Sequence, residues 1–169
     1  MRSVLISIKP EWVAKILNGE KTIEIRKTMP KCELPIDVYI YCTKGDYIGR
    51  ISKKYVGKIV ARFTLDKVEE IELPYTKFGC EEWVGCEEER TLQTKAMSQE
   101  ELLKKGCLSE DEIYGYLNFK NKHYGYAWHI SDLEIFREPK KLSEFGAKRA
   151  PQSWCYVEEK KDKKRVSFD

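Results

Sequence analysis

The first 27 residues of the chain specify a strand, a helix and a second strand from local sequence alone. Residues 3–8 form a largely β-branched apolar run, which predicts a buried strand. Pro10 suits the first position of a helix, because its missing N–H would have no partner there. The helix carries an apolar stripe of Trp12, Val13, Ile16 and Leu17. Gly19 then ends it in a left-handed conformation, so we predict a helix over 10–18 that packs through this stripe.

The second strand, 21–27, alternates apolar and charged residues. Because side chains alternate across a strand, Ile23 and Ile25 face one side. Glu24 and Arg26 share the other face, where they are close enough to form an ion pair.

Lys21 lies at the mouth of this strand, so the unit from Gly19 has the spacing G-x-K-x-x-E-x-R. A charged triple at a loop–strand junction fits a binding site, because loops held on a rigid scaffold often carry function. It equally fits an ion network that only stabilises the fold, with Lys21 serving the dipole of the preceding helix.

The rest of the chain adds strands and only a few helices. The predicted strands are 37–42, 59–65, 123–130, 133–139 and a short one within 148–157. Ser98 with Glu101, and Ser109 with Glu112, have the capping-box spacing and predict two helix starts. Since helices and strands do not alternate strictly, we predict an α+β fold around a closed or nearly closed sheet.

The 169 residues predict a single domain over 1–157, followed by a charged flexible tail over 158–169. The acidic residues concentrate in an insertion, 72–110, which is irregular over 72–96 and then partly helical. Residues 1–67 carry 14 Lys or Arg and 7 Asp or Glu, whereas residues 68–119 carry 5 and 13. A basic face built from the two ends of the chain would attract phosphates, and the insertion offers a surface to a protein partner. Charges interspersed over solvated surfaces are the alternative.

Several classes of protein are disfavoured by the sequence. No apolar run is long enough to span a bilayer, and the N-terminal run is too short for a signal peptide, so we expect a cytoplasmic protein without disulfides. The common nucleotide, hydrolase and zinc-peptidase motifs are absent, and no cofactor is predicted. We expect His129 to be structural, bonded to a backbone group. The six cysteines contain no C-x-x-C pair, so we expect thiols, with a zinc site at Cys80, Cys86 and Cys107 as the alternative.

The strand with Lys9-Pro10, the helix and the G-x-K-x-x-E-x-R spacing together resemble the ASCH domain family, of the bacterial and phage type. The resemblance continues in 39–44, 57–63, 126–130 and 150–154, in the order typical of that family. It implies a PUA-like fold, a small mixed β-barrel with flanking helices.

The resemblance also implies a cleft that binds RNA or a modified nucleotide. The motif positions that match are Lys9, Gly19, Lys21, Glu24 and Arg26. To these we add Gln152, Ser153 and Trp154, because an amide, a hydroxyl and an indole suit the edge and face of a nucleobase. Core packing is the alternative for Trp154.

Some small bacterial ASCH proteins are amidohydrolases for acetylated cytidine, with a threonine nucleophile in this motif. This chain has Glu24 at that position, and Thr22 lies nearby on the same strand face. A carboxylate beside Lys21 could instead activate water, so the catalytic pair would be Lys21 and Glu24. The leading hypothesis is therefore a module that binds RNA or a modified nucleotide, and the alternative is a small nucleoside or RNA hydrolase that uses the same cleft.

Overall fold

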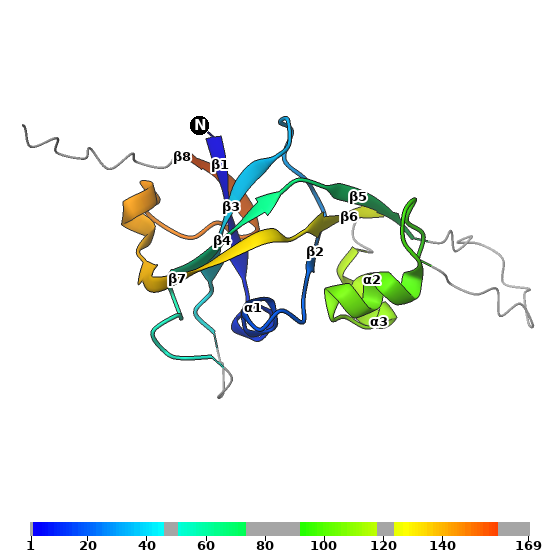
Figure 1. Cartoon of the computed structure of the whole chain (residues 1–169), viewed down its shortest axis with the longest axis horizontal. Helices are drawn as coiled ribbons and strands as arrows, with labels where there is room; N and C mark the ends of the chain where they lie inside the picture. The colour runs from blue at the N-terminus through cyan, green and yellow to red at the C-terminus, as the bar shows by residue number, and fades with distance from the viewer. Residues whose placement is uncertain (1, 46–50, 74–91, 118–123, 159–169) are drawn as a thin grey trace, which may run out of the picture. The chain divides into compact units, whose positions relative to one another are not determined.

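The computed structural model describes residues 2–45, 51–73, 92–117 and 124–158 (Figure 1). The chain divides into two units, each assembled from separate stretches. The first unit contains Met1–Ala14, Ile36–Thr64 and Asp132–Asp169, and the second contains Lys15–Pro35 and Leu65–Ser131. The single domain over 1–157 stays a prediction, and the tail lies outside the described residues from position 159 onward.

The first unit is built on a five-stranded sheet with the order β7-β4-β3-β1-β8. Its strands are β1 (Arg2–Ile8), β3 (Ile36–Cys42), β4 (Ile59–Leu65), β7 (Ser131–Lys140) and β8 (Trp154–Glu158). β1 pairs with β3 in parallel and with β8 antiparallel. Six of its seven residues are buried, as expected for an interior strand with a continuous apolar run. The short 3-10 helix η1 (Leu142–Phe145) adds Phe145 to the core around Leu5 and Tyr39.

The second unit is built on a three-stranded sheet with the order β2-β6-β5. These strands are β2 (Ile23–Arg26), β6 (Tyr124–His129) and β5 (Val68–Glu72), and β6 pairs antiparallel with both neighbours. Two helices, α2 (Gln99–Gly106) and α3 (Glu110–Leu117), contribute Leu102, Ile113 and Leu117 to a core shared with Ile23 and Ile25. The charged residues of β2 therefore lie on the sheet face opposite this core.

The helix boundaries follow the predicted signals. α1 (Pro10–Leu17) starts at Pro10, and Gly19 beyond its end has a φ of 85°. Val13 and Ile16 are the buried members of its stripe. In both capping boxes a serine precedes the helix. Ser98 Oγ accepts from Glu101 N at 3.2 Å, which confirms the predicted helix start at Ser98.

In the second capping box the bonds are reciprocal. Glu112 N donates to Ser109 Oγ at 3.1 Å, and Ser109 N donates to Glu112 Oε1 at 3.2 Å. β5 was not predicted as a strand of its own. Its sequence, Val-Glu-Glu-Ile-Glu, holds three residues that are depleted in strands, and only pairing with β6 makes it one.

The α+β class is confirmed. The described strands form two sheets, and a closed PUA-like barrel stays a prediction. None of the helices in the described ranges is long and apolar enough to cross a membrane.

Candidate functional site

The motif residues Lys21, Glu24 and Arg26 form one charged cluster in the second unit. Arg26 donates from Nε to Glu24 Oε1 at 3.0 Å, and its Nη2 lies 3.0 Å from the same oxygen. Lys21 Nζ lies 3.5 Å from the other oxygen, Glu24 Oε2. The expected same-face pair and the proximity of Lys21 are therefore present, while a role in binding a ligand stays a prediction.

Lys21 joins the ends of two helices. Its backbone N–H donates to Lys15 O of α1 at 3.0 Å, and its Nζ donates to Gly106 O at the end of α2. A cation at a helix C-terminus is favourable, because the last carbonyls carry partial negative charge. The sequence indicated the first helix and missed the second, because Gly106 is 85 residues further along the chain.

The cluster is almost fully removed from solvent. The exposed fractions are 2% for Lys21, 7% for Glu24 and 8% for Arg26. Burial lowers the pKa of Lys21, and the neighbouring Glu24 carboxylate opposes part of that shift. Charges that are buried without a partner destabilise the fold. The Glu24 carboxylate, which pairs with both cations, offsets much of this cost. The result is a buried, hydrogen-bonded group with two kinds of cationic donor and one acceptor.

Tyr116 of α3 lies beside this cluster, and its side chain is exposed. Partial burial raises the pKa of Tyr116, with smaller and opposite effects from the charges of Arg26 and Glu24. Lys27 Nζ lies 4.9 Å from the centre of the Tyr116 ring. The sequence predicted no functional role for Tyr116. The clue in the sequence is that Ile113 and Leu117 account for the buried stripe of this helix without it.

The other predicted ligand-binding residues are divided between the two units. Thr22, on the second unit, is exposed, and its backbone N–H donates to Lys105 O at 2.9 Å. The remaining four, all in the first unit, are Lys9, Gln152, Ser153 and Trp154. A site that combines residues of both units stays a prediction.

The segment before β8 is tied to β1 within the first unit. Ser7 Oγ donates to Pro151 O at 2.6 Å, and Ser7 N donates to Ser153 O at 2.9 Å. Lys9 and Gln152 are exposed. Trp154 is half-buried and meets the Tyr156 ring edge to face at 5.3 Å. It is therefore neither a fully buried core residue nor a fully exposed surface on which a base could stack.

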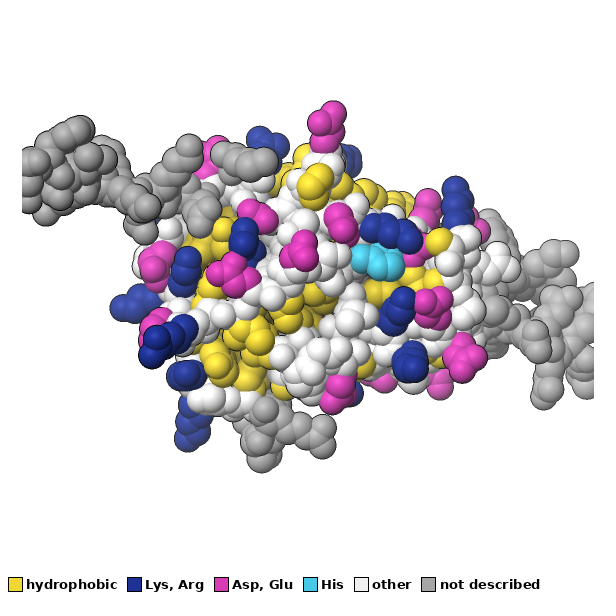
Figure 2. All heavy atoms as spheres, viewed as in Figure 1, with side chains coloured by type: hydrophobic (Ala, Val, Ile, Leu, Met, Phe, Trp, Pro, Cys, Tyr) yellow, Lys and Arg dark blue, Asp and Glu magenta, His cyan; other side chains and the backbone are white. Residues whose placement is uncertain are grey.

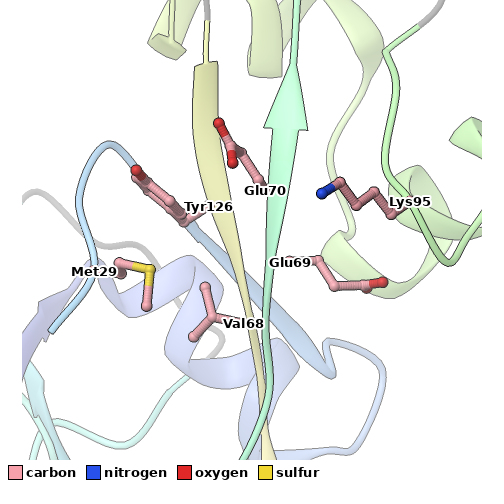
Figure 3. A pocket seen from close by; sticks show the side chains of 6 residues that line it. All are labelled: Met29, Val68, Glu69, Glu70, Lys95 and Tyr126. Atoms are coloured by element: carbon pink, nitrogen blue, oxygen red, sulfur yellow. The ribbon is translucent and has the colours of Figure 1, made fainter. Parts of the chain in front are cut away.

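A pocket of about 290 Å³ lies at β5 and β6 (Figure 3). Its lining residues are Met29, Val68, Glu69, Glu70, Lys95 and Tyr126. Tyr126 is the cross-strand partner of Arg26, so this pocket and the charged cluster are neighbours on one sheet. Nothing in the sequence indicated the pocket, because its residues come from four separate segments.

A comparison with protein-family models gives a match to the ASCH domain over residues 6–126. The chain belongs to the ASCH family. Crystal structures of an ASCH protein from Zymomonas mobilis are similar to this ASCH chain. The structure of the Zymomonas protein without a substitution superposes on this chain with a TM-score of 0.58 and 18% identity. The match covers 92% of this chain and 87% of the Zymomonas chain.

A tyrosine-to-phenylalanine variant of the same protein gives a TM-score of 0.58 and 17% identity, with 92% and 90% covered. At this identity the likeness shows the fold. No curated protein matches the chain.

His129 of the ASCH chain is bonded to a carboxylate rather than to the expected backbone group. Its Nε2 lies 2.7 Å from Glu69 Oε2, and Lys67 Nζ lies 3.7 Å from Glu69 Oε1. Glu69 is buried, and its Oε1 accepts no hydrogen bond among the described residues.

A metal site would need further ligands. Within the parts of the chain that the structure describes, no three His, Cys, Asp or Glu side chains are grouped to hold a metal. Cys32, Cys42, Cys107 and Cys155 are free thiols. Cys80 and Cys86 of the zinc hypothesis lie outside the described residues.

Proposed function

We propose that this ASCH chain binds RNA or a modified nucleotide beside the buried Lys21–Glu24–Arg26 cluster, with Tyr116 as the exposed residue of the site. The observation that carries the proposal is a set of paired donors and an acceptor beside an exposed aromatic ring in one unit. Relatives with a PUA-like fold bind RNA, which supports the same class of ligand.

The chemistry of the cluster favours a nucleobase over a bare phosphate. A base presents donors and acceptors at its edge and a π-face above it, and RNA-binding proteins use both. Arg26 and Lys21 donate and Glu24 accepts, so only one net positive charge remains for phosphate. Tyr116, with 38% of its side chain exposed, offers the stacking surface. Basic and acidic side chains are also interspersed over the face in Figure 2, which is unlike a continuous basic surface.

The test separates binding from folding by replacing the whole cluster. Exchange of a buried ion network for apolar residues of similar size is often neutral or stabilising, so we expect the triple variant Lys21→Met, Glu24→Leu, Arg26→Met to fold. Its affinity for single-stranded RNA and nucleoside monophosphates, measured by fluorescence anisotropy and calorimetry, is expected to fall at least tenfold. A folded triple variant that binds like the wild type would contradict the proposal.

Tyr116→Ala tests the stacking surface. Loss of one base stack costs about 1–3 kcal/mol, so RNA affinity is expected to fall by a factor of roughly 5 to 150. Tyr156→Ala is the matched control, because Tyr156 is 37% exposed and lies in the first unit. Equal effects of the two substitutions would argue against a stacking role for Tyr116.

A hydrolase that uses the same cluster is the second candidate. The observation in its favour is a buried carboxylate 3.5 Å from a lysine whose pKa is lowered by burial. Glu24 would be the base that activates water, and Lys21 would polarise the substrate. Incubation with acetylated cytidine and with RNA should then give product with the wild type and not with Glu24→Gln. Absence of product above the background of that variant rejects this candidate.

A further inference from the structure

Among the described residues, one edge of the three-stranded sheet has backbone groups without a pairing partner. β5 pairs with β6 on one side only. His129 N donates to Lys67 O at 3.0 Å, so the backbone of Lys67 is directed toward β6. In an antiparallel ladder this direction alternates along the strand. Val68 and Glu70 therefore direct their N–H and C=O groups away from β6, toward the edge.

Glu72 shows how this edge pairs with another strand. Its N–H donates to Gln93 O at 2.9 Å, and Gln93 N–H donates to Glu72 O at 3.0 Å. The chain then turns away, because Thr94 Oγ1 bonds both the N–H and the C=O of Met97. Within the described ranges the ladder consists of this one pair, and no backbone group there pairs with Val68 or Glu70 at the edge.

The pocket of about 290 Å³ lies along the same stretch. Figure 3 shows β5 crossing it, with Met29, Val68 and Tyr126 on one side of the strand and Glu69 and Lys95 on the other. The pocket is therefore a short groove along the edge of β5, with walls from both faces of the sheet. A chain segment that lay in it would continue the ladder begun by Gln93.

We propose that this edge binds an extended, lysine- or arginine-containing peptide segment of a partner protein as an added strand. Unpaired N–H and C=O groups in alternation are the recognition surface for a strand, because each residue of a bound peptide satisfies them by main-chain bonds. The groups of Val68 and Glu70 supply up to four such bonds.

The wall on the side of Glu70 favours a basic residue. On one face, half-buried Val68, Met29 and Tyr126 lie beside the exposed carboxylate of Glu70. A lysine or arginine packs its aliphatic stem on such a surface while its charge reaches the carboxylate. Glu69 on the other face adds a buried oxygen that accepts no hydrogen bond among the described residues. The three glutamates of β5 make an acidic partner strand unfavourable.

The probe is a capped seven-residue peptide of alternating threonine and lysine, titrated into the isotopically labelled chain and followed by NMR. We expect saturable binding below 1 mM, with shifts concentrated at the amides of Val68 and Glu70 and slower hydrogen exchange of both. The same peptide with alternate backbone nitrogens methylated, and one with glutamate for lysine, are expected to bind at least tenfold more weakly.

Two substitutions at Glu70 separate the contribution of its backbone to peptide binding from the contribution of its side chain. Glu70→Pro removes an edge N–H without removing a bond to β6, and proline is tolerated at such edge positions. It is expected to weaken the peptide at least tenfold. Glu70→Ala keeps the N–H and is expected to weaken it only two- to fivefold, through loss of the charge.

Three results would overturn the proposal. They are no binding of the threonine–lysine peptide at 1 mM, equal binding of its methylated form, and shifts away from β5. Sedimentation tests whether the chain associates with itself. If it does, and if Glu70→Pro abolishes this association while the peptide does not compete with it, the edge binds a second copy of the chain instead. The triple variant at Lys21, Glu24 and Arg26 is expected to retain peptide binding, so failure of the RNA proposal would leave this one standing.

Discussion

Removing the Glu24 carboxylate isolates two buried cations, and its cost follows from the structure. In Glu24→Ala, Lys21 and Arg26 keep their burial but lose the oxygens at 3.5 and 3.0 Å. Breaking a buried ion pair by deleting one partner costs about 3–5 kcal/mol. Lys21 still donates to Gly106 O, so we expect the lower end, about 3 kcal/mol. For a chain of this length that corresponds to a fall in Tm of about 6–12 °C.

The matched control is a shorter ion pair at the surface. Glu101 Oε1 lies 2.7 Å from Lys105 Nζ, closer than either contact of Glu24, but the two side chains are 44% and 43% exposed. Exposed pairs of this kind contribute little to stability, because water screens them. Glu101→Ala should therefore cost far less than Glu24→Ala, although its ion pair is the shorter one.

Urea denaturation followed by tryptophan fluorescence measures both variants, and an unchanged m value shows that the denatured state is comparable. If the two variants differ by less than about 1 kcal/mol, the cluster is solvated in solution and the reasoning from burial is wrong. The triple apolar variant is expected to recover the stability that Glu24→Ala loses, because it leaves no buried charge unpaired.

Three further predictions follow from single positions. A Cβ at Gly125 would approach Leu117 Cδ1 to 2.7 Å, so Gly125→Ala should lower the free energy of unfolding by about 1–3 kcal/mol, and no measurable loss would show that Leu117 can move. The pKa of Lys21 lies below its ordinary value of 10.5, so the folded chain holds this proton less tightly than the unfolded chain. Between the lowered pKa and 10.5, the free energy of unfolding of the wild type should therefore rise with pH relative to Lys21→Met, and parallel curves would refute this. Burial raises the pKa of Cys42 to about 11, so at pH 8 iodoacetamide should modify it much more slowly in the folded than in the urea-unfolded chain, as peptide mapping can measure.

Local sequence was sufficient to predict β1, α1 and β2. Pro10, the apolar stripe and Gly19 act within a few residues of one another, and the structure follows them. The ion pair of Glu24 with Arg26 was predictable for the same reason, since residues two apart in a strand share a face. Both capping boxes depend on residues three apart and were likewise readable.

The surroundings of the cluster were decided by contacts between distant residues. Gly106 and Tyr116 come from helices about 85 and 90 residues beyond β2, and no spacing rule connects them to Lys21 or Arg26. Their positions depend on how α2 and α3 bury Leu102, Ile113 and Leu117 against Ile23 and Ile25. The burial of the three charges follows from that packing, which the sequence alone could not predict.

β5 shows the same division. Its three glutamates argue against a strand, and its partner β6 begins 52 residues after it ends. Backbone pairing with β6 overrides that weak local preference, because each ladder bond satisfies groups that burial would otherwise leave unpaired. The sequence by itself thus determined the motif and the face on which it lies. Tertiary packing determined how deeply its charges are buried, which aromatic ring stands beside them and which strand edge remains open.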